Sequence, residues 1–211
     1  MAGKNTYRIG TDGSANFASL AAIPPELLTQ QDTTFLIYPG TYAALTNAVL
    51  DDAAFIGLGD REEIVINGAF TIANTSANTT VFENITLVGP NATATSGSAC
   101  VTKLGAASAP LRFRNVVFSN ADFAVNHNGE GAFALLSKQV QIDNSDLSGV
   151  DRAVRANANT TVNFSIMNTS SNAYFTPNGG AGLIPNILVR ASTSGGANTG
   201  NSTKTVLALV S

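Results

Sequence analysis

The chain has 211 residues, enough for one domain with a sizeable core; only 12% of them are charged, and the formal net charge is −3. Its lysines and arginines are scattered, whereas nucleic-acid-binding domains carry a concentrated basic face, so we expect no nucleic-acid partner. No segment approaches the roughly 20 apolar residues of a membrane span, and no apolar run of signal-peptide length follows Met1. The single cysteine, Cys100, excludes an intrachain disulfide and is expected to be a small buried residue.

The first expected element is a short amphipathic helix that covers the N-terminal end of the domain, within residues 10–30. Asn16 is a residue type that caps helices, and Phe17, Leu20 and Ile23 follow at a helical spacing that gives one apolar face. Pro24-Pro25 is expected to end this helix, because proline cannot continue it.

Short β-prone runs of about three to six residues follow, separated by Gly, Asn, Ser and Asp. No long helical pattern lies between them, which argues against βαβ units and favours a sandwich, a barrel or a β-solenoid. The runs are Thr34–Tyr38, Ala54–Leu58, Ile64–Ile66, Phe70–Ile72, Ile85–Val88, Leu111–Phe113, Val116–Phe118, Val140–Ile142, Val162–Phe164 and Ile187–Arg190.

An internal repeat favours the solenoid. The segments that begin at Phe82, Phe113 and Ile142 share one pattern, an apolar residue, a polar residue and Asn before a second short run. Subtraction of the residue numbers gives separations of 31 and 29 residues, close to one solenoid coil. Asn84, Asn115 and Asn144 would then stack at one corner as a hydrogen-bonded ladder. The alternative is three unrelated turn asparagines.

Three segments carry a family resemblance: Gly10–Pro24 with its Asp-Gly turn, Thr34–Tyr42 with Pro-Gly-Thr-Tyr, and Phe55–Gly68 with Leu-Gly-Asp. They resemble the opening coils of pectinesterases and other pectin-lyase-like proteins, over residues 10–88. The resemblance implies an all-β, single-stranded right-handed parallel β-helix whose N-terminal end is plugged by a short helix. We expect residues 1–191 to form this domain, with the cap at 10–30, and residues 192–211 to form a connector and a terminal strand.

No complete catalytic motif of those enzymes is present. Asp122-Phe123 and Gly149–Asp151 match only fragments of a pectinesterase motif, and the chain has no Trp. The only Asp pair, Asp51-Asp52, falls in an early turn, where solvated residues are expected. We therefore predict no catalytic residues, no cofactor and no metal site.

Two groups of residues are weaker candidates for a catalytic site. A pectate-lyase-like site needs several carboxylates around calcium and a basic group. The nearest match comes from adjacent coils, and we favour a surface charge network as its explanation. Its residues are Asp143, Asp146, Asp151, Arg152 and Arg155. The only histidine, His127, lies in a polar loop where it is either solvated or a general base with Glu130 as its companion.

The C-terminal segment changes character. Residues 192–201 are rich in Ser, Thr, Gly and Asn, as in a flexible connector, and an apolar β-prone run follows. We expect this run to make assembly contacts with another subunit through Val206, Leu207, Leu209 and Val210. The alternative is that it folds back as the final coil or covers the C-terminal end.

An enzyme-like fold without enzyme motifs, disulfides or a secretion signal predicts a non-enzymatic structural protein, such as a capsid decoration or cement protein of a virus (phage) particle. Its expected partners are further copies of itself, as a trimer, and a capsid or other assembly protein. Its expected location is the virion, after synthesis in the host cytoplasm, and no membrane is involved. The alternative is a carbohydrate-binding or carbohydrate-active β-helix, which four Tyr and no Trp support weakly.

Overall fold

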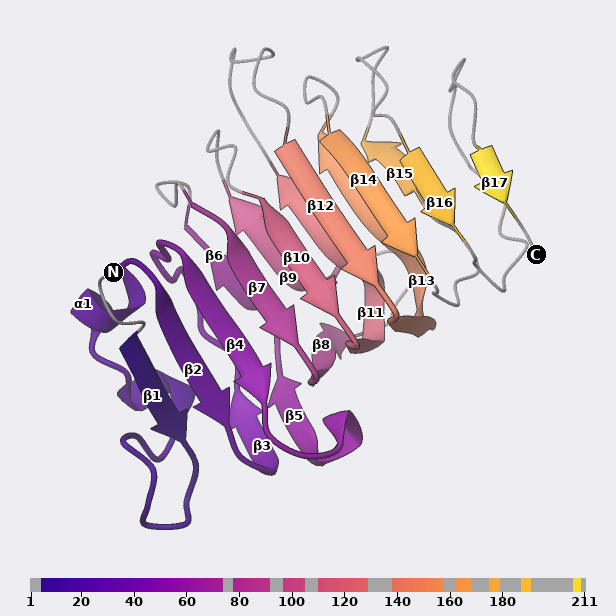
Figure 1. Cartoon of the computed structure of the whole chain (residues 1–211). Helices are drawn as coiled ribbons and strands as arrows, with labels where there is room; N and C mark the ends of the chain where they lie inside the picture. The colour runs from indigo at the N-terminus through magenta and orange to yellow at the C-terminus, as the bar shows by residue number, and fades with distance from the viewer. Residues whose placement is uncertain are drawn as a thin grey trace.

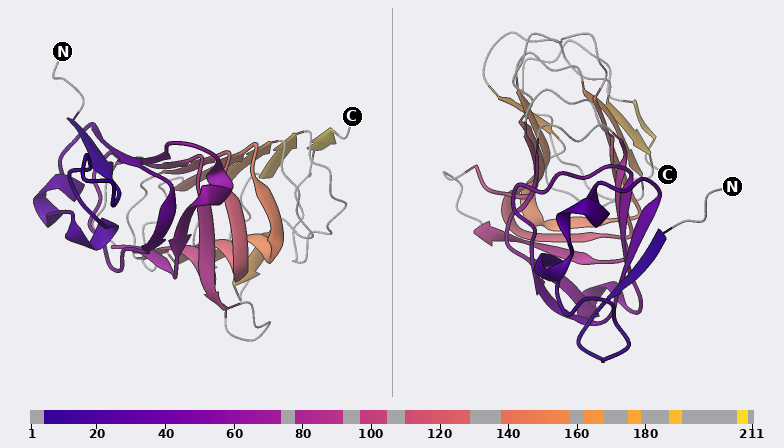
Figure 2. Two further views of the ribbon diagram at one scale, coloured as in Figure 1. Left: turned by 90° about the horizontal axis from the view of Figure 1, so that it is seen from below. Right: turned by 90° about the vertical axis from the view of Figure 1, so that its left-hand side faces the viewer.

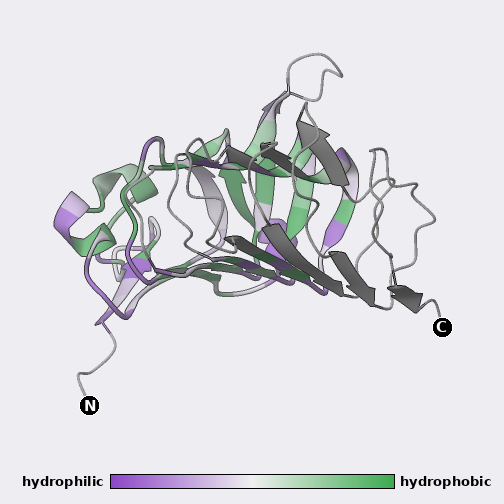
Figure 3. Ribbon diagram, turned by 90° about the horizontal axis from the view of Figure 1, so that it is seen from above, coloured by the Kyte–Doolittle hydropathy of each residue, from purple (hydrophilic) through white to green (hydrophobic). Residues whose placement is uncertain are grey.

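The computed structural model describes residues 5–73, 78–91, 97–104, 110–128, 138–157, 162–167, 175–178, 187–190 and 207–209. Parallel strands stack coil upon coil into a β-solenoid, so the predicted all-β solenoid is confirmed (Figure 1). The hydropathy colouring shows apolar strand segments along both walls and polar stretches among the turns (Figure 3). Among the described residues, no helix is long and apolar enough to cross a membrane.

Two sheets form the walls. The first has nine strands in the order β1-β2-β4-β7-β10-β12-β14-β16-β17, and the second has eight. The strands of the first sheet are β1 (Asn5–Ile9), β2 (Thr33–Ile37), β4 (Ala53–Gly57), β7 (Thr80–Glu83), β10 (Leu111–Arg114), β12 (Lys138–Asp143), β14 (Val162–Met167), β16 (Ile187–Arg190) and β17 (Leu207–Leu209). Those of the second are β3 (Gly40–Ala43), β5 (Ile64–Asn67), β6 (Phe70–Ile72), β8 (Thr86–Asn91), β9 (Ala99–Leu104), β11 (Val117–Asn128), β13 (Asp146–Asn157) and β15 (Phe175–Asn178).

The register of the first sheet follows the sequence repeat. Phe113 pairs with Phe82 on one side and with Ile142 on the other, so the separations of 31 and 29 residues are the lengths of two coils. The repeat-based prediction of which residues stack is therefore confirmed for these coils.

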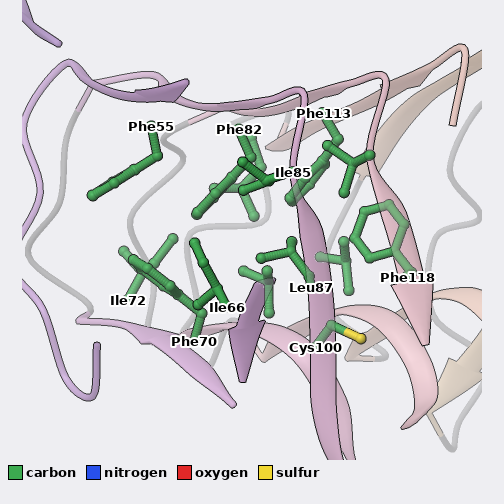
Figure 4. Packing of buried hydrophobic residues seen from close by; sticks show 14 of the residues in the cluster. Phe55, Ile66, Phe70, Ile72, Phe82, Ile85, Leu87, Cys100, Phe113 and Phe118 are labelled. Atoms are coloured by element: carbon green, nitrogen blue, oxygen red, sulfur yellow. The ribbon is translucent and has the colours of Figure 1, made fainter. Parts of the chain in front are cut away.

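The core is built around an aromatic stack in the first sheet. Tyr7, Phe35, Phe55, Phe82 and Phe113 occupy one register row, and neighbouring ring centroids lie 5.2–5.9 Å apart. The four phenylalanines are fully buried, and Figure 4 shows three of them, Phe55, Phe82 and Phe113, in one row. Each coil thus adds one ring to the stack, and aromatic pairs of this kind contribute about 0.5–1.5 kcal/mol beyond their buried area.

The second sheet bends where its long strands pass from one side of the solenoid to the next. The first part of β11 pairs with β8 and its last part pairs with β9, with a register shift between Ser119 and Ala121. At this bend Asn120 has a left-handed φ of 56°, and its Nδ2 donates to the carbonyl oxygen of Gly89 in the preceding coil, 3.0 Å away. Asparagine tolerates this conformation better than most residues, so it permits the corner.

The N-terminal cap differs from the predicted helix. Leu20–Ala22 form a single 3-10 turn (η1), and Pro25–Leu28 form one turn of α-helix (α1). Phe17 lies in an isolated bridge beside Ile9 instead of a helix, and the Asn16 side chain accepts a hydrogen bond from the Arg8 backbone N–H. The turn η1 ends at Ala22, before Pro24-Pro25, and Pro25 then begins α1, because a proline fits the first helical position, where no N–H is needed.

Candidate interaction surfaces and the asparagine corner

The chain itself closes the N-terminal end of the solenoid. The Gly10 N–H donates to the Phe17 carbonyl oxygen at 2.9 Å, and the N–H groups of Asn16 and Phe17 donate to the Arg8 carbonyl oxygen at 2.9 and 3.1 Å. Within β1 these contacts reach Arg8, so they cover the outer edge near the C-terminal end of this strand. Leu20 and Ile23 are buried and Phe17 packs against the core, and the end-on view shows this segment lying across the end (Figure 2).

An open hollow of about 610 Å³ lies beside this cap. Its walls come from η1 and α1 on one side and from residues 44–49 on the other. Val49, which is 41% exposed, is the one strongly exposed large apolar side chain among the described residues.

The predicted asparagines meet at the corner between the two sheets. Asn84, Asn115 and Asn144 have left-handed φ angles of 56°, 52° and 48°. Asn115 Nδ2 donates to Asn84 Oδ1 at 2.7 Å, and Asn84 Nδ2 donates to the carbonyl oxygens of Gly57 and Gly59 at 3.1 and 2.6 Å. The hydrogen-bonded ladder therefore links Asn84 and Asn115, whereas Asn144 occupies the corresponding corner of the next coil with an exposed side chain.

A charged turn, η2 (Arg61–Glu63), lies over this corner. The Arg61 guanidinium donates to Asn115 Oδ1 at 3.0 Å, and the Thr86 hydroxyl donates to the Arg61 carbonyl oxygen at 2.9 Å. The hydrogen bond from Arg61 lowers the pKa of the Glu62 carboxyl. This role of Arg61 could not be predicted from the sequence, because its partner lies 54 residues further along the chain.

Several acidic residues considered for chemistry are bound to backbone or turn groups. Asp122 is buried, and its Oδ2 accepts a hydrogen bond from the Ser98 N–H at 3.0 Å, which holds the backbone at Ser98 in place. Asp52 has a φ of 53° in a turn, and the carboxylate of Asp51 accepts a hydrogen bond from Asn78. These contacts define turns and do not orient a pair of carboxylates towards one substrate.

The proposed lyase-like group is only partly described. Asp143 accepts a hydrogen bond from Gln141 at 2.6 Å, Asp146 accepts one from the Ser148 N–H at 2.8 Å, and Asp151 is exposed. The side chains of Arg152, Arg155 and His127, and all of Glu130, lie outside the described residues. In the part of the chain that is described, no three His, Cys, Asp or Glu side chains are arranged to hold a metal ion.

Lys103 is a buried basic residue that the sequence analysis missed. It lies on β9, is fully buried, and donates from Nζ to the Ala73 carbonyl oxygen at 3.0 Å. Its register neighbours are Ile72 and His127. A lysine buried in a solenoid wall carries no sequence signal, since Thr102-Lys103-Leu104 reads as an ordinary strand end.

The predicted assembly segment continues the first sheet. β17 pairs in parallel with β16, with Leu207 beside Leu188 and Leu209 beside Arg190. This placement agrees with the alternative prediction, in which the segment forms the final coil of its own chain. Val206 and Val210, and the expected connector at 192–201, lie outside the described residues, so contact with another subunit stays a prediction.

Comparison with protein-family models, with curated proteins and with solved structures finds no match to this chain. The resemblance to pectin-lyase-like proteins therefore stands on the quoted motifs, while the parallel β-solenoid stands on the strand pairing itself.

Proposed function

We propose that this protein is a non-enzymatic structural component of a larger assembly, of the kind that decorates or cements a virus capsid. It acts as a rigid solenoid that binds further copies of itself and a second assembly protein. Membership of the pectin-lyase-like superfamily is part of the same proposal.

One observation supports the structural role: several polar side chains in the walls and at the corner of the solenoid hold backbone groups in place. Asp122 binds the Ser98 N–H, Asn84 binds the Gly57 carbonyl oxygen, and Lys103 binds the Ala73 carbonyl oxygen. Buried polar groups that are satisfied in this way rigidify a fold and specify its register. A rigid body with a closed end suits a load-carrying role better than catalysis.

The carbohydrate alternative needs aromatic rings free to lie against sugars. Tyr7 instead stacks on Phe35 with ring centroids 5.9 Å apart, and its hydroxyl donates to Gln30. Tyr42 is buried, and its hydroxyl donates to the Tyr38 carbonyl oxygen at 2.9 Å. These contacts favour the structural proposal.

The test is to follow the protein through density-gradient fractionation of its native source and to assay the purified chain on uronic-acid polymers. We expect co-sedimentation with particles and no hydrolysis, lyase or esterase turnover. A matched pair of variants, Asp151→Ala and His127→Ala, should assemble as the unmodified chain does. Turnover that either variant abolishes would show that the protein is an enzyme.

A further inference from the structure

The outer face of the first sheet changes from apolar to charged along the solenoid. Side chains alternate between the core and the outside along a strand, so Leu36 on β2 and Ile56 on β4 point away from the core that Phe35 enters. Both outward side chains are partly exposed. On β10 the outward positions instead carry Arg112 and Arg114. Neighbouring apolar side chains on an outer face are typical of an interaction surface.

The apolar part of this face extends beyond one row of residues. The Tyr38 N–H donates to the Ile9 carbonyl oxygen at 2.9 Å, and the Leu58 N–H donates to the Ile37 carbonyl oxygen at 2.8 Å. The chain therefore continues β2 and β4 by one residue each, and alternation places these two partly exposed side chains on the outer face. Figure 1 shows this face towards the viewer, and no described helix lies across β2 or β4 there. We call these apolar residues the outer patch: Leu36, Tyr38, Ala54, Ile56, Leu58 and Val81.

Opposite charges flank the outer patch in one register row. This row runs from β1 to β7 through Arg8, Leu36, Ile56 and Glu83. Arg8 is exposed, and among the described residues no ion pair or side-chain hydrogen bond holds its guanidinium. Glu83 has the Arg114 guanidinium 3.8 Å away on its other side. A row with a cation at one end, an anion at the other and two apolar residues between them is complementary to the same row reversed.

A two-fold axis parallel to the strands, midway between β2 and β4, reverses the row in this way. Sheets that pack face to face lie about 10 Å apart, and this axis places β1 of one copy over β7 of the other and β2 over β4. Arg8 then faces Glu83 of the second copy at both margins of the patch. A two-fold axis that runs across the strands would place each strand over its own equivalent and give no such ion pair.

We propose that two copies of this chain pack face to face through the outer patch, about this axis, with two Arg8–Glu83 ion pairs at its margins. This inference rests on the proposed function and deepens it, because it identifies one partner as a second copy and the contact as a wall of the solenoid. The building block is then a two-fold dimer in place of the expected trimer.

The size of the patch sets the expected affinity. The strands from β1 to β7 lie about 4.8 Å apart and contribute about five residues each at about 3.3 Å per residue, so the face covers roughly 300 Å² per copy. This area is typical of functional surface patches, but it is below the roughly 800 Å² per partner of a standard stable interface. We therefore expect a reversible dimer. The molecular mass, measured by light scattering, should rise from one copy to two as concentration increases.

A charge swap gives the most direct test. Arg8→Glu alone places two carboxylates opposite each other, and Glu83→Arg alone places two guanidinium groups together, so each should weaken the dimer at least about tenfold. The double variant restores opposite charges and should bring the affinity back to within about threefold of the unmodified chain. The matched control, Glu26→Arg, makes the same charge change at an exposed position of α1 outside the patch and should leave the dimer unchanged.

A substitution near the centre of the patch tests the apolar contact. Ile56→Lys places a charge against Leu36 of the second copy and should abolish the dimer. Ser148→Lys introduces the same side chain at an exposed site of β13, on the second sheet, and should leave the dimer intact. Circular dichroism and urea unfolding establish that each variant is folded. If Ile56→Lys does not fold, the charge swap alone decides.

Three results would overturn this inference: a monomer at every concentration, a trimer mass, or a double variant that associates no more tightly than the single variants. Patch variants that lose co-sedimentation with particles while the unmodified chain stays monomeric would mean that the patch binds a different protein, which also overturns it. A monomer that still co-sediments with particles would refute this inference and leave the proposed function standing. Turnover on uronic-acid polymers by a dimeric chain would refute the proposed function and leave the dimer standing.

Discussion

Asn84 gives the most informative test of how the corner holds neighbouring coils together. Its side chain makes three hydrogen bonds, two donated to the Gly57 and Gly59 carbonyl oxygens and one accepted from Asn115. Each hydrogen bond contributes about 0.5–1.5 kcal/mol net, so the three together stabilise the fold by about 2–4 kcal/mol. The left-handed φ of 56° would cost an alanine about 1–2 kcal/mol more.

Three substitutions at this position separate the two contributions. Asn84→Gly keeps the backbone conformation and should lower the free energy of unfolding by about 2–4 kcal/mol. Asn84→Ala loses the same hydrogen bonds and adds backbone strain, so its free energy of unfolding should be lower than that of the glycine variant by about 1–2 kcal/mol. Asn84→Asp turns a carboxylate towards two carbonyl oxygens, which raises its pKa in the folded state. That variant should therefore gain stability as the pH falls through this raised pKa, relative to the unmodified protein.

Urea unfolding followed by circular dichroism, with linear extrapolation to water, measures all three differences. Because domains are stable by only about 5–15 kcal/mol, losses of this size shift the midpoint clearly. A glycine variant as stable as the unmodified chain would refute the hydrogen-bond account. An alanine variant no worse than glycine would refute the strain account.

Three further predictions concern the core, the cap and the thiol. Phe82→Ala removes a ring that lies 5.5 Å from Phe55 and 5.2 Å from Phe113, and should lower the free energy of unfolding by about 3–5 kcal/mol in the same urea assay; Phe82→Leu, its control, should lose less than half of that. Leu20→Asp places a carboxylate at a fully buried site of the cap and should cause aggregation on expression, so a melting temperature equal to that of the unmodified protein would contradict the cap. Cys100, with its pKa raised to about 12, should resist thiol reagents at pH 8 until guanidinium unfolds the chain; since the unfolded thiol loses its proton first, stability should fall as the pH rises above about 8.5.

The sequence predicted the coil register well, because stacking makes equivalent residues recur at one coil length. Phe82, Phe113 and Ile142 share a pattern that survives differences in loop length, and the same pattern located the corner at Asn84 and Asn115. Periodicity is a local signal, and each coil of a solenoid contacts its neighbours in the chain.

What the sequence did not predict depends on contacts between coils. The strand β1 was missed because Asn5–Ile9 alternates polar and apolar residues too briefly to stand out, and the bend of β11 at Asn120 was missed because one strand serves two sides of the solenoid. The reach of Arg61 to Asn115 and the burial of Lys103 are likewise set by residues of other coils. A charged residue in a turn or a strand gives no sign of such a partner.

The aromatic stack has a consequence for synthesis on the ribosome. Every ring that follows Tyr7 in the stack, from Phe35 to Phe113, meets a partner that was made only 20–31 residues earlier, so each new coil can pack on a coil that already exists. Folding can then advance in the order of translation, one coil at a time, without waiting for the C-terminus. Nascent chains halted after Phe113 should already resist protease over the coils that they contain. The N-terminal coils would then be the first part of the solenoid to fold, and each later coil would pack on the one before it.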